Sequence, residues 1–537
     1  MVRSRGKDWL TAGALTVLTL ASRIPFASRL FFNSDTTRFA LALEHFDVSQ
    51  MRPHAPGYIL YVASAKLVDL FVHDASTSLV GVNILASALT VAVLYFLSLR
   101  MFGRTNAAFS AILLASSPLF WFNGEMALTY ALEGLFAILF AYSCFLILSG
   151  EAKWILHSAV LLGIATGIRQ NMIIFLLPLW FFSFRKLPLK KIVGSFLVYG
   201  LVCLAWFVPL TVLSGGLPSY LQTLSAQYRT VVEYPAPLLL EIAIRGKILV
   251  PFLLYSLTLG IIPMLYFWGR FFRVTDIIRD IRIRFILVWI LPAFIFYLGV
   301  TLWNPGQVIV ILPPLFMFLT ESLLGLSRDL EEGFGELVGD RFSKFCRRLK
   351  PLFSRGALPA LFAGVIVIFN IIQFVILKTP ISYAAIRAGN AHLSGLIRLT
   401  KGNCAPGKTL ILAGQMNTQA GYYLPDFVVY CPFPLIFSEA YVPIEAQDVY
   451  VSYHHRTSPK RYWVSAGFKV LPILIPDGVD QILIWESDLA KYYQDASRPL
   501  KEIRLDGGDV TAYYLDVKPG EKFVYGYHRW SVSSDIL

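Results

Sequence analysis

Long apolar segments recur from Trp9 to Leu377, and they constrain the fold of this chain more than any other feature. A helix that crosses a bilayer needs about 20 mostly apolar residues, because lipid offers its backbone no hydrogen-bond partner. Eleven segments meet or approach this length, the fifth and sixth being short: 9–29, 79–99, 106–122, 128–149, 154–168, 171–184, 192–214, 248–268, 285–302, 306–325 and 357–377. The sequence therefore predicts a polytopic α-helical membrane protein with about 11 spans.

The charge of the chain agrees with a membrane protein and argues against a nucleic-acid partner. Only 15% of the 537 residues are charged, whereas a soluble domain carries about 25%. The net charge is +13, but the basic residues cluster between apolar segments, which is typical of cytoplasmic loops that face anionic lipid. We therefore expect membrane lipids as partners and no nucleic acid.

The segment 57–72 decides the predicted orientation. It is apolar but short, and it carries Lys66 and Asp69. If it lies flat at the interface as an amphipathic helix, every strongly basic loop falls on the cytoplasmic side. We therefore predict a cytoplasmic N-terminus and an extracytoplasmic C-terminus.

The largest exported regions in this orientation are a first loop over residues 30–78, a loop over 215–247 and a C-terminal domain over 379–537, which follows a transmembrane domain over 1–378. Short exported turns are expected at 123–127, 169–171 and 303–305. In the tail, short apolar or alternating runs are separated by turn residues, which indicates strands. The runs lie at 408–414, 426–430, 447–453, 481–486 and 510–517. We predict an extracytoplasmic domain of α/β or α+β class. Cys404 and Cys431 lie in this tail, where an oxidising compartment permits a bridge, and the sequence does not decide whether they pair.

The unusual polar residues near the apolar segments gather mostly on the exported side. Ionisable groups at membrane depth are costly and mark a functional site by default. The residues concerned are Asp35, Arg38, His54, Glu125, Arg169, Gln170, Asn171, Asn304 and Gln307. The pattern predicts an active site at the extracytoplasmic surface.

The first exported loop combines a carboxylate with an imidazole. Asp35 follows the first apolar segment, a helix is expected from Thr37 to Phe46, and His54 precedes an Ala-Pro-Gly break. Such a pair suits the deprotonation of a hydroxyl nucleophile. The alternative is that Asp35 caps the following helix and that His54 is an ordinary loop histidine.

The order of these features resembles the membrane glycosyltransferases of the GT-C fold, especially the protein O-mannosyltransferase and aminoarabinose-transferase branch. The resemblance covers residues 1–325 and rests on the first-loop acid, on HAPGY at 54–58 and on NPGQVIVILPP at 304–314. HAPGY is similar to an HPPGYPLY-like motif, with Ala55 in place of the first proline. In such enzymes the first-loop aspartate is the catalytic base, so the resemblance implies this role for Asp35.

Such enzymes carry a second acidic residue in the next exported turn, and Glu125 in FNGEMALTY stands at its place. The resemblance therefore implies a catalytic-site role for Glu125: holding the acceptor, positioning the partner of Asp35 or binding a divalent cation. The alternative is an ordinary interfacial glutamate. An Asp-Glu pair is common in the first loop of these enzymes, and Thr36 replaces the Glu here, which puts an acidic-pair or metal role at that spot in doubt. We expect Arg38 and Tyr58 to bind the acceptor. Glu133 lies deeper in an apolar segment and requires a partner, because a lone buried carboxylate is costly.

Basic residues near the exported surface are candidates for binding a donor phosphate. Arg169 in GIRQN is the first of them, since a guanidinium binds phosphate in bidentate fashion. Its alternative role is simple contact with lipid headgroups. Arg229, Arg245 and Lys247 in the loop 215–247 are further candidates. Gln307 either lines the donor site or caps a helix.

The resemblance, taken with these features, implies an inverting glycosyltransferase of a bacterial or archaeal inner or cell membrane. It would move a sugar from a polyprenyl-phosphate donor to a hydroxyl of a protein, lipid or glycan acceptor at the extracytoplasmic face. No cofactor follows from the sequence, and a divalent metal is compatible with it, although no metal-ligand spacing is present. Two other classes stay open: a transporter or lipid-linked sugar flippase, and a noncatalytic glycan-binding scaffold.

Overall fold

The computed structural model describes residues 2–232, 238–271, 279–302, 304–337, 357–430, 450–456, 463–469, 473–490, 498–505 and 510–523. Contacts divide the chain into two compact units. The first unit comprises Met1–Ala27, Tyr58–Leu210 and Pro237–Ile386, and the second comprises Ser28–Gly57, Thr211–Ala236 and Arg387–Leu537.

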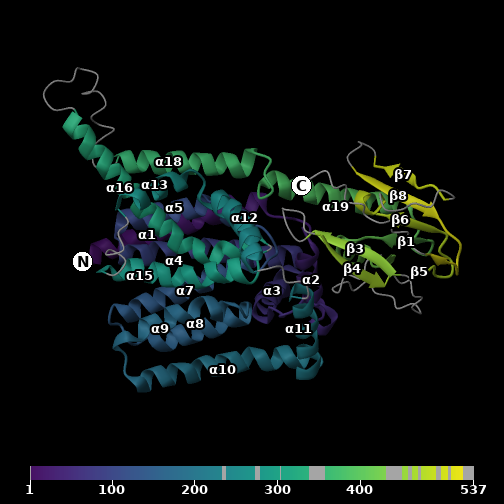
Figure 1. Cartoon of the computed structure of the whole chain (residues 1–537), viewed down its shortest axis with the longest axis horizontal. Coiled ribbons are helices and arrows are strands. Elements are labelled where there is room, and N and C mark those ends of the chain that lie inside the picture. Colours follow the sequence, from purple (N-terminus) through teal and green to yellow (C-terminus); the bar gives the residue numbers. More distant parts are fainter. Residues whose placement is uncertain are drawn as a thin grey trace. The chain divides into compact units, whose positions relative to one another are not determined.

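The first unit is a bundle of apolar helices, numbered in chain order as in Figure 1. The helix α4 lies inside this bundle, where it packs against α1, α3, α5 and α7. A helix that is apolar or small-sided all round is suited to burial among neighbours. The helices are α1 (Val2–Arg23), α3 (Ile59–Val72), α4 (Ala75–Met101), α5 (Arg104–Ser116), α6 (Pro118–Gly124), α7 (Tyr130–Leu148), α8 (Trp154–Ile168), α9 (Met172–Ser183), α10 (Leu189–Leu213), α12 (Leu238–Leu257), α13 (Ile261–Phe271), α15 (Ile281–Gly299), α16 (Leu312–Leu337) and α18 (Ala357–Ile371).

Eight of the described helical segments are long and apolar enough to cross a membrane, or nine if α5 and α6 form one broken span. The shorter apolar helices α8 and α9 coincide with the two short segments expected from the sequence. The polytopic helical class is therefore confirmed, and the chain is an integral membrane protein. The count of about 11 spans stays a prediction.

Two segments that the apolar pattern suggested as single helices are divided. The segment 106–122 breaks by 63° between α5 and α6, where Pro118 begins α6 and removes a backbone donor. The segment 306–325 opens as the 3₁₀ helix η5 (Pro305–Ile311) before α16 begins. Proline chemistry, which hydropathy does not register, explains the break at α6.

A helix is confirmed in the ambiguous segment 57–72, where α3 runs from Ile59 to Val72. It buries Tyr61 and Val62 on one side, whereas Phe71 is 82% exposed on the other. Exposed apolar side chains on a helix too short to span are suited to an interfacial position. That α3 lies flat on the membrane stays a prediction.

The second unit contains a five-stranded mixed sheet in the order β2-β1-β6-β8-β7. The strand β1 (Thr409–Leu412) runs parallel to β2 (Val428–Tyr430) and to β6 (Gln481–Ile484), and β8 (Thr511–Asp516) runs antiparallel to β6 and to β7 (Lys501–Arg504). These strands confirm four of the expected runs. The fifth run, 447–453, overlaps β3 (Tyr450–Arg456), and its residues 447–449 lie outside the described residues.

Both faces of this sheet are covered, which explains why β1 is buried at every position. Leu410 and Leu412 pack on one side, and Ile411 packs on the other against Leu396 and Leu399 of α19 (Tyr383–Asn403). The smaller elements of the unit are α2 (Ser34–Glu44), η2 (Val48–Gln50), α11 (Leu217–Val232), α20 (Asn417–Tyr423), β4 (Trp463–Lys469), β5 (Ile473–Leu474), α21 (Ser487–Ala490) and β9 (Lys522–Phe523). The side chains of β1 thus alternate between two covered faces, and the small sheet expected in the C-terminal part of the chain is present.

Candidate active site

The first exported loop begins with a capped helix that positions Asp35. The Asn33 side chain accepts a hydrogen bond from the backbone N–H of Thr36 at 3.0 Å, and the Thr36 hydroxyl accepts one from the N–H of Asn33 at 3.1 Å. This reciprocal capping box starts α2 at Ser34, three residues before the start expected from the sequence. Asn33 therefore caps the helix, and the Asp35 carboxylate lies in its first turn without serving as the cap.

Three of the predicted site residues meet around this turn. The Oδ1 of Asp35 lies 3.7 Å from Nδ1 of His54 and 4.0 Å from Nη1 of Arg38. The Asp35 side chain is 41% exposed, whereas those of His54 and Arg38 are 13% and 8% exposed. The His54 ring also packs on Phe39 of α2, with their centroids 5.7 Å apart. An accessible carboxylate therefore stands beside a largely buried imidazole and guanidinium.

The end of the HAPGY motif forms the turn that opens α3. Gly57 has a φ of 107° and Tyr58 has a φ of 47°, so both lie in the left-handed region. Glycine adopts this region without cost, but a bulky residue such as tyrosine is strained there, and such strain is concentrated at functional sites. The Gly-Tyr pair thus has a specific backbone role in addition to any contact its side chain makes.

The ring of Tyr58 is one side of a buried cluster around Arg169. The Arg169 guanidinium lies 6.0 Å from the centroid of Tyr58 and 5.2 Å from that of Tyr130. Its Nη1 donates to both carboxylate oxygens of Glu133, at 3.2 and 3.4 Å, and the Thr129 hydroxyl also donates to this carboxylate. The partner expected for Glu133 is therefore Arg169, whose opposite charge compensates the buried carboxylate.

Glu125 is fully buried at the end of α6. The indole N–H of Trp121 donates to its Oε1 at 2.6 Å, and its Oε2 is buried with no hydrogen-bond partner among the described residues. Arg23 at the end of α1 is also fully buried, with its guanidinium 4.6 Å from the Trp121 ring centroid. Sequence reasoning missed Arg23, although an arginine inside an apolar segment is itself a signal of function or pairing.

The remaining phosphate candidates have different surroundings. Gln307 accepts a hydrogen bond from the backbone N–H of Asn304 at 2.9 Å, so it serves in the cap of η5. The Nη1 of Arg245 donates to the carbonyl oxygen of Leu298 at 3.2 Å, and Lys247 is exposed. Arg229 lies in α11, and its side chain is outside the described part of the structure.

The structure thus brings the predicted residues together in two groups. Asp35, Arg38 and His54 belong to the second unit, and Tyr58 and Arg169 belong to the first. The predicted meeting of Asp35 with Arg169 in one pocket joins the two units and stays a prediction.

Comparison with known proteins identifies the architecture. Residues 54–213 match the sequence profile of the family described as dolichyl-phosphate-mannose-protein mannosyltransferase. The structure of ArnT from Cupriavidus metallidurans bound to undecaprenyl phosphate is similar to this chain with a TM-score of 0.59 and 13% identity, covering 94% of this chain and 97% of that one. ArnT from the same organism in the apo state gives a TM-score of 0.57 and 14% identity over 96% and 98% of the two chains. The chain has the GT-C fold. None of the curated protein sequences matches it.

The resemblance to GT-C glycosyltransferases that the first loop suggested is therefore confirmed. Thr36, which stands where an Asp-Glu pair would have its glutamate, uses its hydroxyl in the capping box of α2. Among the described residues, no group of three or more His, Cys, Asp or Glu side chains is arranged to hold a metal ion. Cys404 has a free thiol, and Cys431 lies outside the described residues.

Proposed function

We propose that this protein is an inverting glycosyltransferase that moves a sugar from a polyprenyl-phosphate donor to a hydroxyl acceptor at the extracytoplasmic membrane face. The GT-C fold makes a membrane glycosyltransferase the natural class. The similar ArnT structure was solved with undecaprenyl phosphate, which supports a prenyl phosphate as the lipid part of the donor.

The accessibility of Asp35 is the observation that carries this proposal. A general base has to reach the proton that it removes. The side chain of Asp35 is 41% exposed, whereas that of Glu133 is 2% exposed and paired with Arg169. Glu125 is fully buried. Among the candidate carboxylates, Asp35 is therefore the one that an acceptor hydroxyl can approach.

The reaction uses these groups in one displacement. Asp35 takes the proton from the acceptor hydroxyl, and the oxygen attacks the anomeric carbon of the donor sugar. The bond from that carbon to the phosphate oxygen breaks, and polyprenyl phosphate leaves with the electron pair. Attack from the side opposite the leaving phosphate inverts the anomeric configuration.

The other predicted residues support this displacement. His54 orients the Asp35 carboxylate, and Arg38 and Tyr58 contact the acceptor. Arg169 faces the leaving phosphate, where a fixed positive charge stabilises the transition state, and Arg229, Arg245 and Lys247 contribute to the donor side. In this arrangement the N-terminus is cytoplasmic and α3 lies on the outer surface of the bilayer.

The test is transfer from a panel of synthetic prenyl-phosphate sugars to acceptors in membrane extracts, with the purified chain reconstituted in liposomes. We compare the wild type with the variant Asp35→Asn, which keeps the shape of the side chain and removes its basicity. Transfer by the wild type from at least one donor, and its loss in the variant, would support the proposal.

Equal transfer by both proteins would remove Asp35 from the reaction. Absence of transfer with every donor would favour a transporter or a noncatalytic scaffold. A matched control is Lys66→Gln, which changes an exposed charge on α3 and should leave transfer unchanged.

A further inference from the structure

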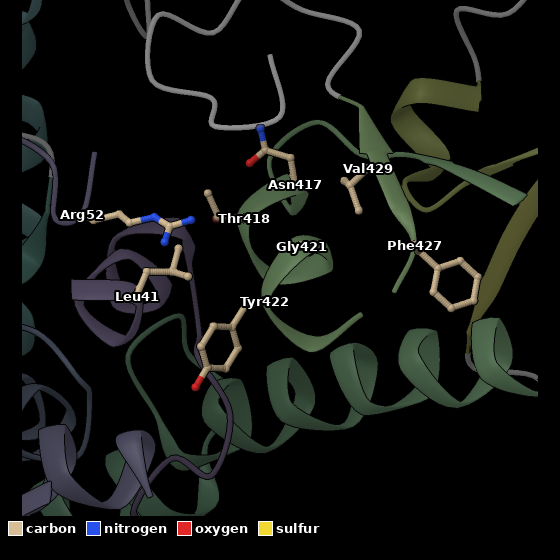
Figure 2. A pocket seen from close by; sticks show the side chains of 8 residues that line it. All are labelled: Leu41, Arg52, Asn417, Thr418, Gly421, Tyr422, Phe427 and Val429. Atoms are coloured by element: carbon tan, nitrogen blue, oxygen red, sulfur yellow. The ribbon is translucent and has the colours of Figure 1, made fainter. Parts of the chain in front are cut away.

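The second unit contains a mixed polar and aromatic cavity of about 250 Å³. One wall comes from the first loop, and the other comes from α20 and β2, more than 350 residues later in the chain. Figure 2 shows Arg52 extending from the first-loop side toward Thr418 and Asn417. The described lining residues are Leu41, Arg52, Asn417, Thr418, Gly421, Tyr422, Phe427 and Val429.

The side chain of Asn417 is the first sign that the cavity binds a ligand. Asn417 is 4% exposed, and its Nδ2 is buried with no hydrogen-bond partner among the described residues. A buried donor without a partner is costly, because it has lost water and gained nothing in exchange. A ligand oxygen in the cavity would satisfy this N–H group.

The position of Arg52 is the second sign. Its backbone N–H donates to the carbonyl of Asp47 at 2.9 Å, and its own carbonyl accepts from the N–H of Asp47 at 2.6 Å. These two bonds hold the residue at a defined place on the loop. Arg52 is the one charged group among the eight described lining residues, and none of them is acidic. The cavity therefore favours a ligand that carries negative charge.

The remaining walls indicate the size and shape of that ligand. Tyr422 is braced against Phe31 and Tyr423, with ring centroids 5.2 and 5.0 Å away. Aromatic walls suit the apolar faces of a sugar ring. A volume of about 250 Å³ is below the roughly 300–1,000 Å³ of pockets that enclose a whole drug-sized ligand. The space matches one ring-sized unit of a larger molecule.

We propose that this cavity binds one anionic sugar unit, carrying a carboxylate or a phosphate, within the acceptor. Arg52 contacts the anion, Asn417 donates to a ring or hydroxyl oxygen, and the aromatic wall packs on the ring. The inference deepens the proposed function, because it gives the acceptor class as an acidic glycan, but binding itself requires no transfer.

The experiment measures binding of small probes to the full chain in detergent, without donor, by isothermal titration calorimetry. The probes are glucuronate, glucose 6-phosphate, glucose and glycerol 3-phosphate. Hydrogen bonds to a charged group contribute more binding free energy than those between neutral groups. We therefore expect an acidic sugar to bind about tenfold or more tightly than glucose. Arg52→Gln should reduce this preference to near unity, and Asn417→Leu should weaken all three sugars about fivefold.

The control is Gln415→Ala, a change at an exposed residue of the same segment that does not line the cavity. It should bind every probe as the wild type does. Arg52→Lys keeps the charge and should retain most of the preference, which guards against a folding defect in Arg52→Gln.

Equal affinity for glucuronate and glucose would overturn the inference, and so would a preference for acidic sugars that survives Arg52→Gln. Tighter binding of glycerol 3-phosphate than of either acidic sugar would also overturn it, because the site would then belong to a phospholipid headgroup. The variant Asp35→Asn should keep full binding. The binding experiment can therefore fail while the transfer experiment succeeds, and the reverse, so the two proposals are tested separately.

Discussion

Replacing Asp35 by asparagine tests whether its carboxylate acts in catalysis or only stabilises α2. In the structure Asn33, not Asp35, caps α2. Asp35 thus contributes to stability through its charge in the first helical turn, worth about 0.3–1 kcal/mol, and through a partly exposed pair with Arg38 at 4.0 Å, worth about 0–1 kcal/mol. A positioned general base contributes about 10²–10⁴-fold to a rate.

The comparison variant is Asn33→Ala, which removes the cap and leaves the carboxylate. Loss of such a cap costs about 0.5–2 kcal/mol. We therefore expect Asp35→Asn to lose transfer by about 10²–10⁴-fold with a small change in melting temperature. Asn33→Ala should be at least as destabilised but lose less than about tenfold in transfer, since general-base chemistry is intact.

Initial rates of sugar transfer in liposomes and thermal unfolding followed by tryptophan fluorescence would measure the two quantities. A transfer rate that falls in step with stability across the two variants would contradict a catalytic role for Asp35. In that case Asp35 would act on the structure of α2 and not on the acceptor.

Two further predictions concern ion pairs. Glu133→Gln leaves the charge of Arg169 without its buried counterpart, so the free energy of unfolding should fall by about 3–5 kcal/mol. Thermal unfolding would show this as a lower melting temperature. An unchanged melting temperature would show that Glu133 does not compensate a buried charge on Arg169. In the C-terminal domain, the Arg498 guanidinium, 2.7 Å from Glu521, holds the pKa of that carboxyl below its usual 4.5. The folded-state pKa is lowered, so the pair stabilises fully above about pH 4.5 and its contribution of about 0.2–1 kcal/mol disappears as the pH falls through the lowered pKa. Arg498→Gln should remove that part of the pH dependence, and parallel curves for both proteins would contradict it.

Features that lie within one stretch of chain were predictable from the sequence. Continuous apolar segments of about 20 residues indicate spanning helices, because a helix of that length crosses the bilayer and satisfies its own backbone hydrogen bonds. The alternating runs of the tail indicated β1, β2, β6 and β8 correctly, because their residues alternate between two covered faces. Asp35 and His54 were expected to cooperate because one short loop carries both.

Partners that lie far apart in the chain were not predictable, and two local features were missed as well. A partner for Glu133 was required by the cost of burial, but nothing in the spacing pointed to Arg169, 36 positions away. The reciprocal bonds between Asn33 and Thr36 start α2 three residues before the expected Thr37. Arg23 was missed because the run around it is apolar on average.

The cavity of the second unit also depends on residues that lie far apart in the chain. Its walls come from a loop near the N-terminus and from a helix that starts at Asn417. A single sequence carries no signal that these residues meet, since each wall taken alone reads as an ordinary loop or short helix.

The fate of a labelled donor in proteoliposomes tests the central claim. A prenyl-phosphate sugar with an isotope in its sugar ring is added with an acceptor extract on the side that carries the C-terminal domain. If the protein is the proposed glycosyltransferase, the label appears on the acceptor with inverted anomeric configuration, and one molecule of polyprenyl phosphate is released for each sugar transferred. Label that crosses the bilayer still attached to the intact donor, with no glycosylated product, would contradict the claim.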